Sequence, residues 1–198
     1  MIKFTQLSND LPYSIFKEKY DIALNANQKN IEAVCISSYS SRLNEVNSRF
    51  VNLKLVDKKD FIFFTNYESP KSVEFKEHNQ ITAVFYWSTV NIQIRLKALI
   101  KKTTKDFNDI YFSNRSKKKN ALAISSQQSK KIDSYEKVIE NHKKSLELDN
   151  LTKCPEYWGG YSFTPFYFEF WDGHESRINK RNIFKISNDK WKNYIIQP

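Results

Sequence analysis

The chain has 198 residues, 40% of them hydrophobic and 15% aromatic, which excludes a disordered polymer and predicts a single folded domain over residues 1–198. No run approaches the ~18 apolar residues of a membrane helix, and the first residues lack an apolar export segment, so a cytoplasmic protein is expected. The 32 Lys and Arg against 22 Asp and Glu give a formal charge of +10, which suits nucleic acid, anionic lipid or a phosphorylated small molecule but is equally what a Lys- and Asn-rich composition gives when nothing binds.

The first half of the sequence predicts a helix followed by strands. Apolar residues at helical spacing indicate a helix over about residues 11–27, with Asp10 as a plausible cap. Three β-rich segments follow at residues 33–36, 49–56 and 60–65, and the last is apolar enough to be buried on both faces. Ser69 as a cap and Pro70 at the first helical position then predict a short helix to about residue 78.

The second half returns to strands around a helical insertion. Residues 81–87 are mostly apolar, and residues 92–100 alternate between apolar and polar, as in a half-exposed antiparallel strand. Residues 104–147 have a helical pattern with breaks near 114–120 and 129, and strands are expected at 161–171, 177–186 and 191–196. The order predicts an α+β, mainly β fold, an antiparallel barrel with peripheral helices.

Few residues suggest catalysis by pattern alone. The three histidines and the two cysteines stand apart and fit no metal spacing, so no metal site is predicted and the cysteines are expected as reduced thiols. Lys71, in the first turn of the helix after Ser69, suits a phosphate cradle, although spacing alone slightly favours an ordinary capped helix with an exposed lysine. Arg49 and Lys54, five residues apart, fall on opposite faces of a straight strand; to meet one ligand, the strand must bulge or they must address different parts of it.

The C-terminal segment is the most specific. Residues 157–161, 169–173 and 177–181, followed by Trp191 and Pro198, resemble the C-terminal signature of the pyridoxamine 5′-phosphate oxidase family. Earlier segments resemble the same family in the same order, from about residue 33 to the end. They are residues 49–54, 64–71, 85–87 with Gln93, 111–115, and 128–129.

The resemblance implies an FMN-binding split barrel that forms a homodimer, with FMN at the subunit interface and neither nucleic acid nor membrane as a partner. The residues that it assigns to FMN are Arg49, Phe50, Val51, Lys54, Phe64, Thr65, Lys71, Gln93, Gln128, Ser129, Trp171 and Arg181. Those that it assigns to a phosphorylated pyridine substrate are Lys54, Tyr111, Arg115, Lys119, Arg177 and Asn179, with Arg177 and Asn179 as catalytic residues.

The implied reaction is oxidation of pyridoxine or pyridoxamine 5′-phosphate, with hydride transfer from C4′ to flavin N5. Dioxygen reoxidises the flavin, and the products are pyridoxal 5′-phosphate and hydrogen peroxide. Three residues depart from the family pattern: Pro70 replaces an arginine, Lys119 a serine and Asn179 a histidine. These departures favour as an alternative a non-catalytic or substrate-shifted flavin protein, for example one acting on another aromatic ring as in phenazine biosynthesis. A nucleic-acid binder is favoured only by the net charge and by aromatic residues expected at the surface.

Overall fold

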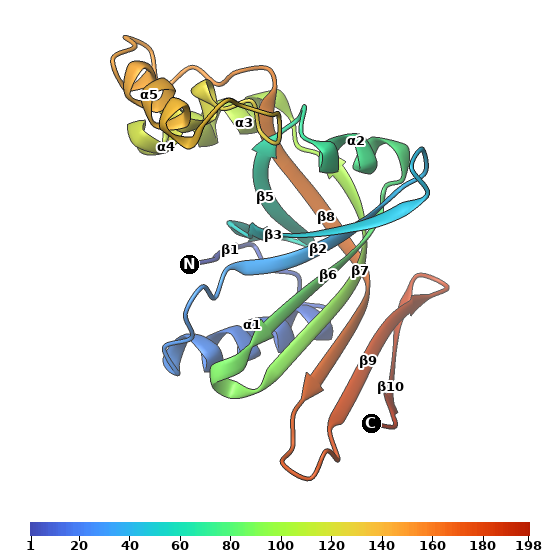
Figure 1. Cartoon of the computed structure of the whole chain (residues 1–198). Coiled ribbons are helices and arrows are strands. Elements are labelled where there is room, and N and C mark those ends of the chain that lie inside the picture. The colour runs from blue at the N-terminus through green and yellow to red at the C-terminus, as the bar shows by residue number, and fades with distance from the viewer.

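Ten strands join in one sheet in the computed structural model, which describes all residues 1–198 (Figure 1). The sheet order is β1-β4-β5-β8-β7-β6-β2-β3, with β9 pairing with β8 and β10 with β9. Every pair is antiparallel except β1 with β4, which confirms the mainly β, antiparallel fold. The strands are β1 (Lys3–Thr5), β2 (Ala33–Ser40), β3 (Glu45–Asn52), β4 (Leu55–Asp57), β5 (Asp60–Asn66), β6 (Gln80–Trp87), β7 (Ile92–Lys102), β8 (Trp158–Asp172), β9 (Lys180–Ser187) and β10 (Lys190–Ile196).

Five helices lie around the sheet. α1 runs beside its lower half, and α3, α4 and α5 gather beyond the upper ends of β5 and β8 (Figure 1). None of the helices is long and apolar enough to cross a membrane. The helices are α1 (Leu11–Asn25), α2 (Pro70–Glu77), α3 (Lys105–Ser113), α4 (Lys117–Ser125) and α5 (Tyr135–Leu146), with a short 3₁₀ turn at Ser88–Val90.

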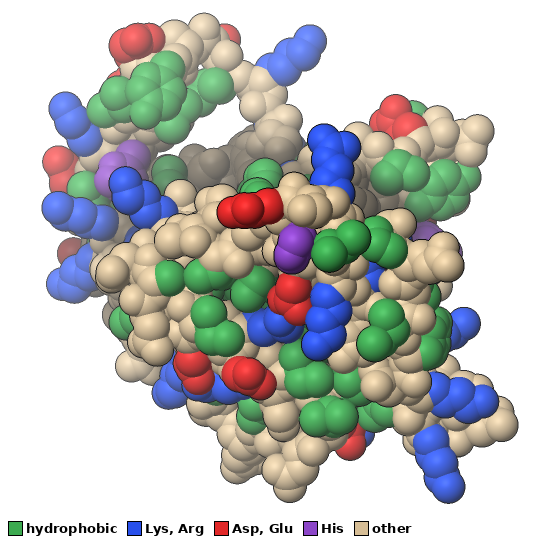
Figure 2. All heavy atoms as spheres, turned by 90° about the horizontal axis from the view of Figure 1, so that it is seen from below, with side chains coloured by type: hydrophobic (Ala, Val, Ile, Leu, Met, Phe, Trp, Pro, Cys, Tyr) green, Lys and Arg blue, Asp and Glu red, His purple; other side chains and the backbone are tan.

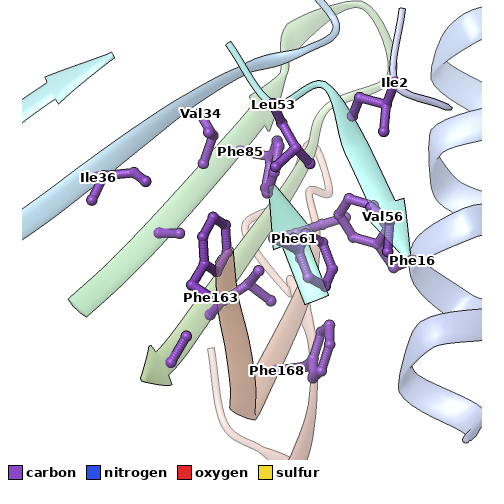
Figure 3. Close-up of a cluster of buried hydrophobic side chains, with 14 of the residues drawn as sticks. Ile2, Phe16, Val34, Ile36, Leu53, Val56, Phe61, Phe85, Phe163 and Phe168 are labelled. Carbon is purple, nitrogen blue, oxygen red and sulfur yellow. The ribbon is translucent and has the colours of Figure 1, made fainter. Parts of the chain in front are cut away.

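The aromatic core fills the space between α1 and the strands. Phe16 of α1 points into it and meets Phe61 edge-on, with ring centroids 4.9 Å apart (Figure 3). Phe85 of β6 lies 5.3 Å from Phe16, again edge to face, and Phe163 of β8 stacks on Phe61. Each of these rings is fully buried, so aromatic packing of Phe16 holds the predicted helix against β5 and β6, and Phe163 of β8 supports Phe61.

In the middle of the sheet, the burial of the strand residues follows the hydrophobic patterns of the sequence. In β7 the buried residues Ile92, Ile94 and Leu96 alternate with the half-buried Gln93 and Arg95. In β5, residues 61–63 are all buried, because the strand lies between β4 and β8 and is covered on both faces. Alternation and its absence therefore distinguished a half-exposed strand from a fully buried one.

Several predicted boundaries were wrong for local reasons. The segment 49–56 is two strands, because the chain leaves β3 after Asn52 and enters β4 at Leu55. The strand expected from residue 177 begins at Lys180, because residues 174–177 form a turn in which Arg177 N–H donates to the carbonyl of His174 (2.9 Å). Asp10 occupies the N-cap position of α1, but its side chain makes no capping bond; it pairs with Lys59 instead (2.8 Å).

Two glycines of β8 allow neighbouring side chains to pack closely against the strand and do not form turns. A Cβ on Gly159 would lie 2.2 Å from the hydroxyl of Tyr67, and one on Gly160 would lie 2.6 Å from that of Thr103. No glycine has positive φ, whereas ten other residues do. They are Gln6, Asn27, Asn30, Asn44, Lys58, Asn91, Ser129, Arg177, Asn188 and Asp189.

The excess positive charge is spread out on the face seen from below. Lys and Arg side chains there stand among acidic and apolar ones, mostly toward the rim (Figure 2). This face carries no continuous basic track of the kind that follows a nucleic-acid backbone.

Candidate functional site

A cleft of about 1040 Å³ opens between the edge strand β3 and the helices α2, α3 and α4. Side chains from the end of β5 and from the connection between α4 and α5 complete its lining. The structure brings most of the predicted site residues together here: Arg49, Phe50, Val51, Lys54, Phe64, Thr65, Lys71, Tyr111, Arg115, Lys119, Gln128 and Ser129.

Lys71 is a buried cation at the start of α2. Its side chain is only 7% exposed, and its Nζ donates to the hydroxyl of Ser69 (2.8 Å). Burial, together with the nearby charge of Arg49, lowers the pKa of Lys71 to about 8. Ser69 is the N-cap residue by position, but its hydroxyl donates to the carbonyl of Asn66 (2.8 Å) rather than capping a helix N–H. The helix start therefore keeps amide donors next to a buried, under-compensated charge, which suits an anion.

Arg49 reaches the same place from β3 and is held by a buried carboxylate. Its NH2 donates to Glu74 of α2 (2.8 Å), and its NH1 donates to the hydroxyl of Ser38 (2.5 Å). Glu74, 5% exposed, also accepts from Ser38 and from the side-chain amide of Asn47 (3.0 Å). NH1 also donates to the carbonyl of Ile36 (3.4 Å), so this network fixes the guanidinium and leaves its Nε–H and one N–H of NH2 free for a ligand.

Lys54 lines the same cleft as Arg49 although the two are five residues apart. Because β3 ends at Asn52, Lys54 lies in the connection to β4 and is freed from the alternation of a straight strand. Its Nζ lies 3.3 Å from a carboxylate oxygen of Glu32. A strand break, rather than a bulge, thus brings both cations to one cleft.

Aromatic rings form the wall on the α3 side. Tyr111 stacks on Phe64 with ring centroids 3.6 Å apart, and Phe64 stacks in turn on Trp158 at 5.3 Å. The guanidinium of Arg115 lies 4.6 Å from the centre of the Trp158 ring, and its NH1 donates to Asn120 (3.1 Å). Burial lowers the pKa of Arg115 and raises that of Tyr111. Arg115 is thus held by a ring and an amide, not by a carboxylate, and its charge faces the cleft uncompensated.

Gln128 ties the helical insertion to the sheet. Its side-chain oxygen accepts from the hydroxyl of Thr65 (3.1 Å) and from the N–H of Asn66 (3.4 Å), both at the end of β5. Ser129 follows with φ +70°, and Lys119 lies exposed in the first turn of α4. The cleft therefore has walls from two parts of the chain, which Gln128 links by hydrogen bonds in addition to the stacking of Tyr111 on Phe64.

The other predicted site residues do not line the cleft. Gln93, Trp171 and Arg181 are neighbours in register on β7, β8 and β9. Arg177 and Asn179 lie in the β8–β9 connection, where the side-chain oxygen of Asn179 accepts from the N–H of His174 (3.0 Å). The predicted residues thus form two groups on one chain.

Some cleft residues were missed by sequence reasoning. Glu74 is the most consequential, since it holds Arg49; its spacing of three residues from Lys71 on one helix was the available signal. Leu43 and Glu45, just before and at the start of β3, also line the cleft. Most of the others are small polar residues on an edge strand and at helix ends, which carry no pattern. They are Asn47, Ser48, Asn52, Asn114 and Ser116.

Comparison with known proteins identifies the family of this chain. The sequence model described as "Pyridoxine 5′-phosphate oxidase C-terminal dimerisation region" matches residues 158–198. A pyridoxine/pyridoxamine 5′-phosphate oxidase of Colwellia psychrerythraea is 33% identical over 96% of this chain and 88% of its own. One of Coxiella burnetii is 32% identical over 94% of this chain and 95% of its own. The chain belongs to the pyridoxine/pyridoxamine 5′-phosphate oxidase family.

Solved structures agree on the fold of this oxidase family. PhzG from Burkholderia lata, in complex with tetrahydrophenazine-1-carboxylic acid, superposes with a TM-score of 0.89 at 24% identity, over 94% of this chain and 92% of that one. A pyridoxamine 5′-phosphate oxidase-related, FMN binding protein from Nostoc punctiforme gives a TM-score of 0.76 at 11% identity, over 92% and 97% of the two chains. The split-barrel fold expected from the sequence is confirmed.

Proposed function

We propose that this protein is an FMN-dependent oxidase of pyridoxine or pyridoxamine 5′-phosphate. The observation that carries the proposal is the presence of two cationic groups in one cleft. Arg49 and Lys71 approach it from β3 and α2, whereas Lys54, Arg115 and Lys119 approach it from the β3–β4 connection and from the α3–α4 side. A cofactor and a substrate that each carry a phosphate require two such groups.

The donor set at the start of α2 fits the phosphate of FMN. Lys71 is buried, and its hydrogen-bond partner is a hydroxyl rather than a carboxylate. A bound phosphate dianion would therefore supply the opposite charge that Lys71 lacks. Thr65, Gln128 and Ser129, at the junction of β5 with the helical insertion, add hydroxyl and amide groups for the polar chain of the cofactor. A cleft of about 1040 Å³ is at the upper end of the usual range for ligand pockets and suits two ligands bound together.

The substrate is assigned to the α3 side. Arg115, Lys54 and Lys119 bind its phosphate, and the hydroxyl of Tyr111 donates to it. Arg115 is suited to this role because Trp158 and Asn120 hold it in place without neutralising it. When bound, FMN supplies the acceptor for the electrons that leave C4′ of the substrate and passes them to dioxygen, which yields hydrogen peroxide. The residues of the chain bind and orient the two ligands.

A homodimer completes the site in this proposal. Gln93, Trp171 and Arg181, together with Arg177 and Asn179, are absent from the cleft of their own chain. We assign them to the cleft of a second copy, where Arg177 and Asn179 face the substrate and the other three contact the cofactor. Two observations support this: the matched C-terminal region is described as a dimerisation region, and Phe50, beside the cleft, is 74% exposed.

A different ring substrate is the second candidate. The side-chain oxygen of Asn179 already accepts from His174 N–H, whereas both N–H groups of its amide are without a partner and can donate to a substrate. Lys119 adds a long flexible cation where the family pattern has a hydroxyl. Both features favour a substrate that accepts hydrogen bonds and carries a strongly anionic group. The carboxylated ring bound to PhzG has an anionic group of this kind.

Anaerobic mixing tests the proposal. FMN-loaded protein is combined with pyridoxine 5′-phosphate under nitrogen, and the visible flavin band is followed. We expect the band to bleach and to return when air is admitted, with release of hydrogen peroxide. A persistent band rejects the vitamer phosphate as substrate, and bleaching by a carboxylated tricyclic ring would then favour the second candidate. Failure to take up FMN at micromolar concentration would reject both.

A further inference from the structure

A buried carboxylate lies at the centre of the second group of site residues. Glu169 of β8 is 2% exposed and stands opposite Arg95 of β7 in the sheet register. Arg181 of β9 approaches from the other side, and both guanidiniums form ion pairs with the carboxylate. One buried acid therefore serves two arginines on the two strands that flank it.

Each carboxylate oxygen of Glu169 accepts from a different arginine. Oε1 accepts from Nε (2.9 Å) and NH2 (2.7 Å) of Arg181. Oε2 accepts from Nε (2.9 Å) and NH2 of Arg95, and from the hydroxyl of Tyr167 (3.0 Å). Burial raises the pKa of Glu169, but the hydrogen bonds from Arg95, Arg181 and Tyr167 outweigh it and hold the pKa below its usual value. The carboxylate is therefore an anion with every strong acceptor position used.

Arg181 is left with a defined set of free donors. Of its five N–H groups, two donate to Glu169 and one, on NH1, donates to the carbonyl of Gln197 (3.2 Å). Two N–H groups remain for a ligand. Because a guanidinium is planar, the paired bonds to Glu169 fix the direction of these two relative to Trp171, the neighbour of Arg181 in register.

We propose that Glu169 is a positioning residue for the cofactor, which aims the free N–H groups of Arg181 at FMN. The inference rests on the proposed function, since Arg181 matters here only as a cofactor contact. Arg95 shares the same carboxylate, and its only side-chain partners are Glu169 and Tyr167, neither of which lines the cleft. It therefore provides a matched control on the opposite side of Glu169.

The test measures FMN affinity by quenching of flavin fluorescence in the full-length protein, with thermal unfolding as a check on folding. For Glu169→Gln, which keeps the shape but loses the charge and one acceptor, we expect the dissociation constant to rise about tenfold. For Arg95→Gln, which leaves the Arg181 pair intact, we expect a change of less than about twofold.

The double variant Arg95→Gln/Glu169→Gln separates positioning from charge balance. If Glu169 only neutralises its neighbours, removing one cation along with the anion restores FMN affinity; if it positions Arg181, affinity stays low. Should Glu169→Gln fail to fold, Glu169→Asp keeps the anion but shortens its reach, and we expect several-fold weaker binding. A folded Glu169 variant that binds FMN as the wild type does would overturn the inference alone. A wild type that binds no FMN would overturn the proposed function and this role with it.

Discussion

The buried charge of Lys71 should lower the stability of the ligand-free protein and raise its affinity for the cofactor. The pKa of Lys71 falls from 10.5 to about 8 in the fold, and at about 1.4 kcal/mol per pKa unit this corresponds to about 3 kcal/mol. Keeping the ammonium charged inside the protein costs this amount below pH 8. Because the unfolded chain holds the proton up to pH 10.5, the cost disappears as the pH rises from about 8 to 10.5, so this group makes the ligand-free protein more stable over that window.

Lys71→Met removes both the cost and the phosphate contact. We expect the ligand-free variant to be more stable than the wild type at pH 7, by up to about 3 kcal/mol, and to bind FMN at least tenfold more weakly. Urea unfolding measures the first effect and fluorescence titration the second. A variant that is less stable than the wild type at pH 7 would show that Lys71 is not carrying an uncompensated charge.

The same pKa predicts how FMN binding depends on pH. The phosphate of FMN is a dianion throughout, since its second pKa is about 6, whereas Lys71 of the free protein loses its proton near pH 8. If only the protonated form binds, the apparent dissociation constant rises about tenfold between pH 7 and pH 9. In Lys71→Met the constant should be flat over this range. A flat wild type, or a variant with the same slope, would refute the assignment of Lys71 to the phosphate.

Three further results are expected. Arg115→Ala should raise the Michaelis constant for pyridoxine 5′-phosphate by roughly 10–100-fold, because it removes a charge-assisted contact; an unchanged constant in steady-state kinetics would exclude Arg115 from the substrate site. Asn179→Ala should lower kcat/KM about tenfold by releasing the turn that carries Arg177, whereas Asn179→Asp keeps the acceptor for His174 N–H and should lose less. Gly159→Ala should destabilise the protein by about 1–3 kcal/mol, since its Cβ would collide with the Tyr67 hydroxyl; a thermal midpoint within a degree of the wild type would contradict this packing.

Sequence reasoning succeeded where a pattern has one structural cause. The alternation from Ile92 onward and the unbroken apolar run of β5 identified their strands, because burial on one face or on two leaves different periodicities. It failed where pairing between segments distant in the chain decided the outcome. β1, three residues long, was missed because its parallel pairing with β4 leaves no periodic trace in so short a segment.

The candidate site shows the same limit. Position and residue type singled out Lys71, Arg49 and Lys54, and the resemblance gave them ligands. Spacing alone could not say that Glu74 would join them or that the chain would leave β3 in time to bring Lys54 to the same cleft. Nor could spacing divide the predicted residues into the group that lines the cleft and the group that includes Arg181. That division depends on which strands are neighbours in the sheet, a property of topology that no local pattern contains.

Some residues with positive φ belong to the proposed site, whereas others lie away from it, and only the strain at the others can be removed without cost to the site. Most of the positions with positive φ are filled by Asn or Asp, which tolerate this conformation, but Gln6, Lys58, Ser129 and Arg177 do not belong to that class. Lys58 lies in an exposed turn, so Lys58→Gly should raise the free energy of unfolding by up to about 1 kcal/mol. Ser129 and Arg177 belong to the proposed site, where the same replacement would relax the backbone and lose the side chain. Stabilisation of this protein should therefore begin at Lys58 and leave Ser129 and Arg177 untouched.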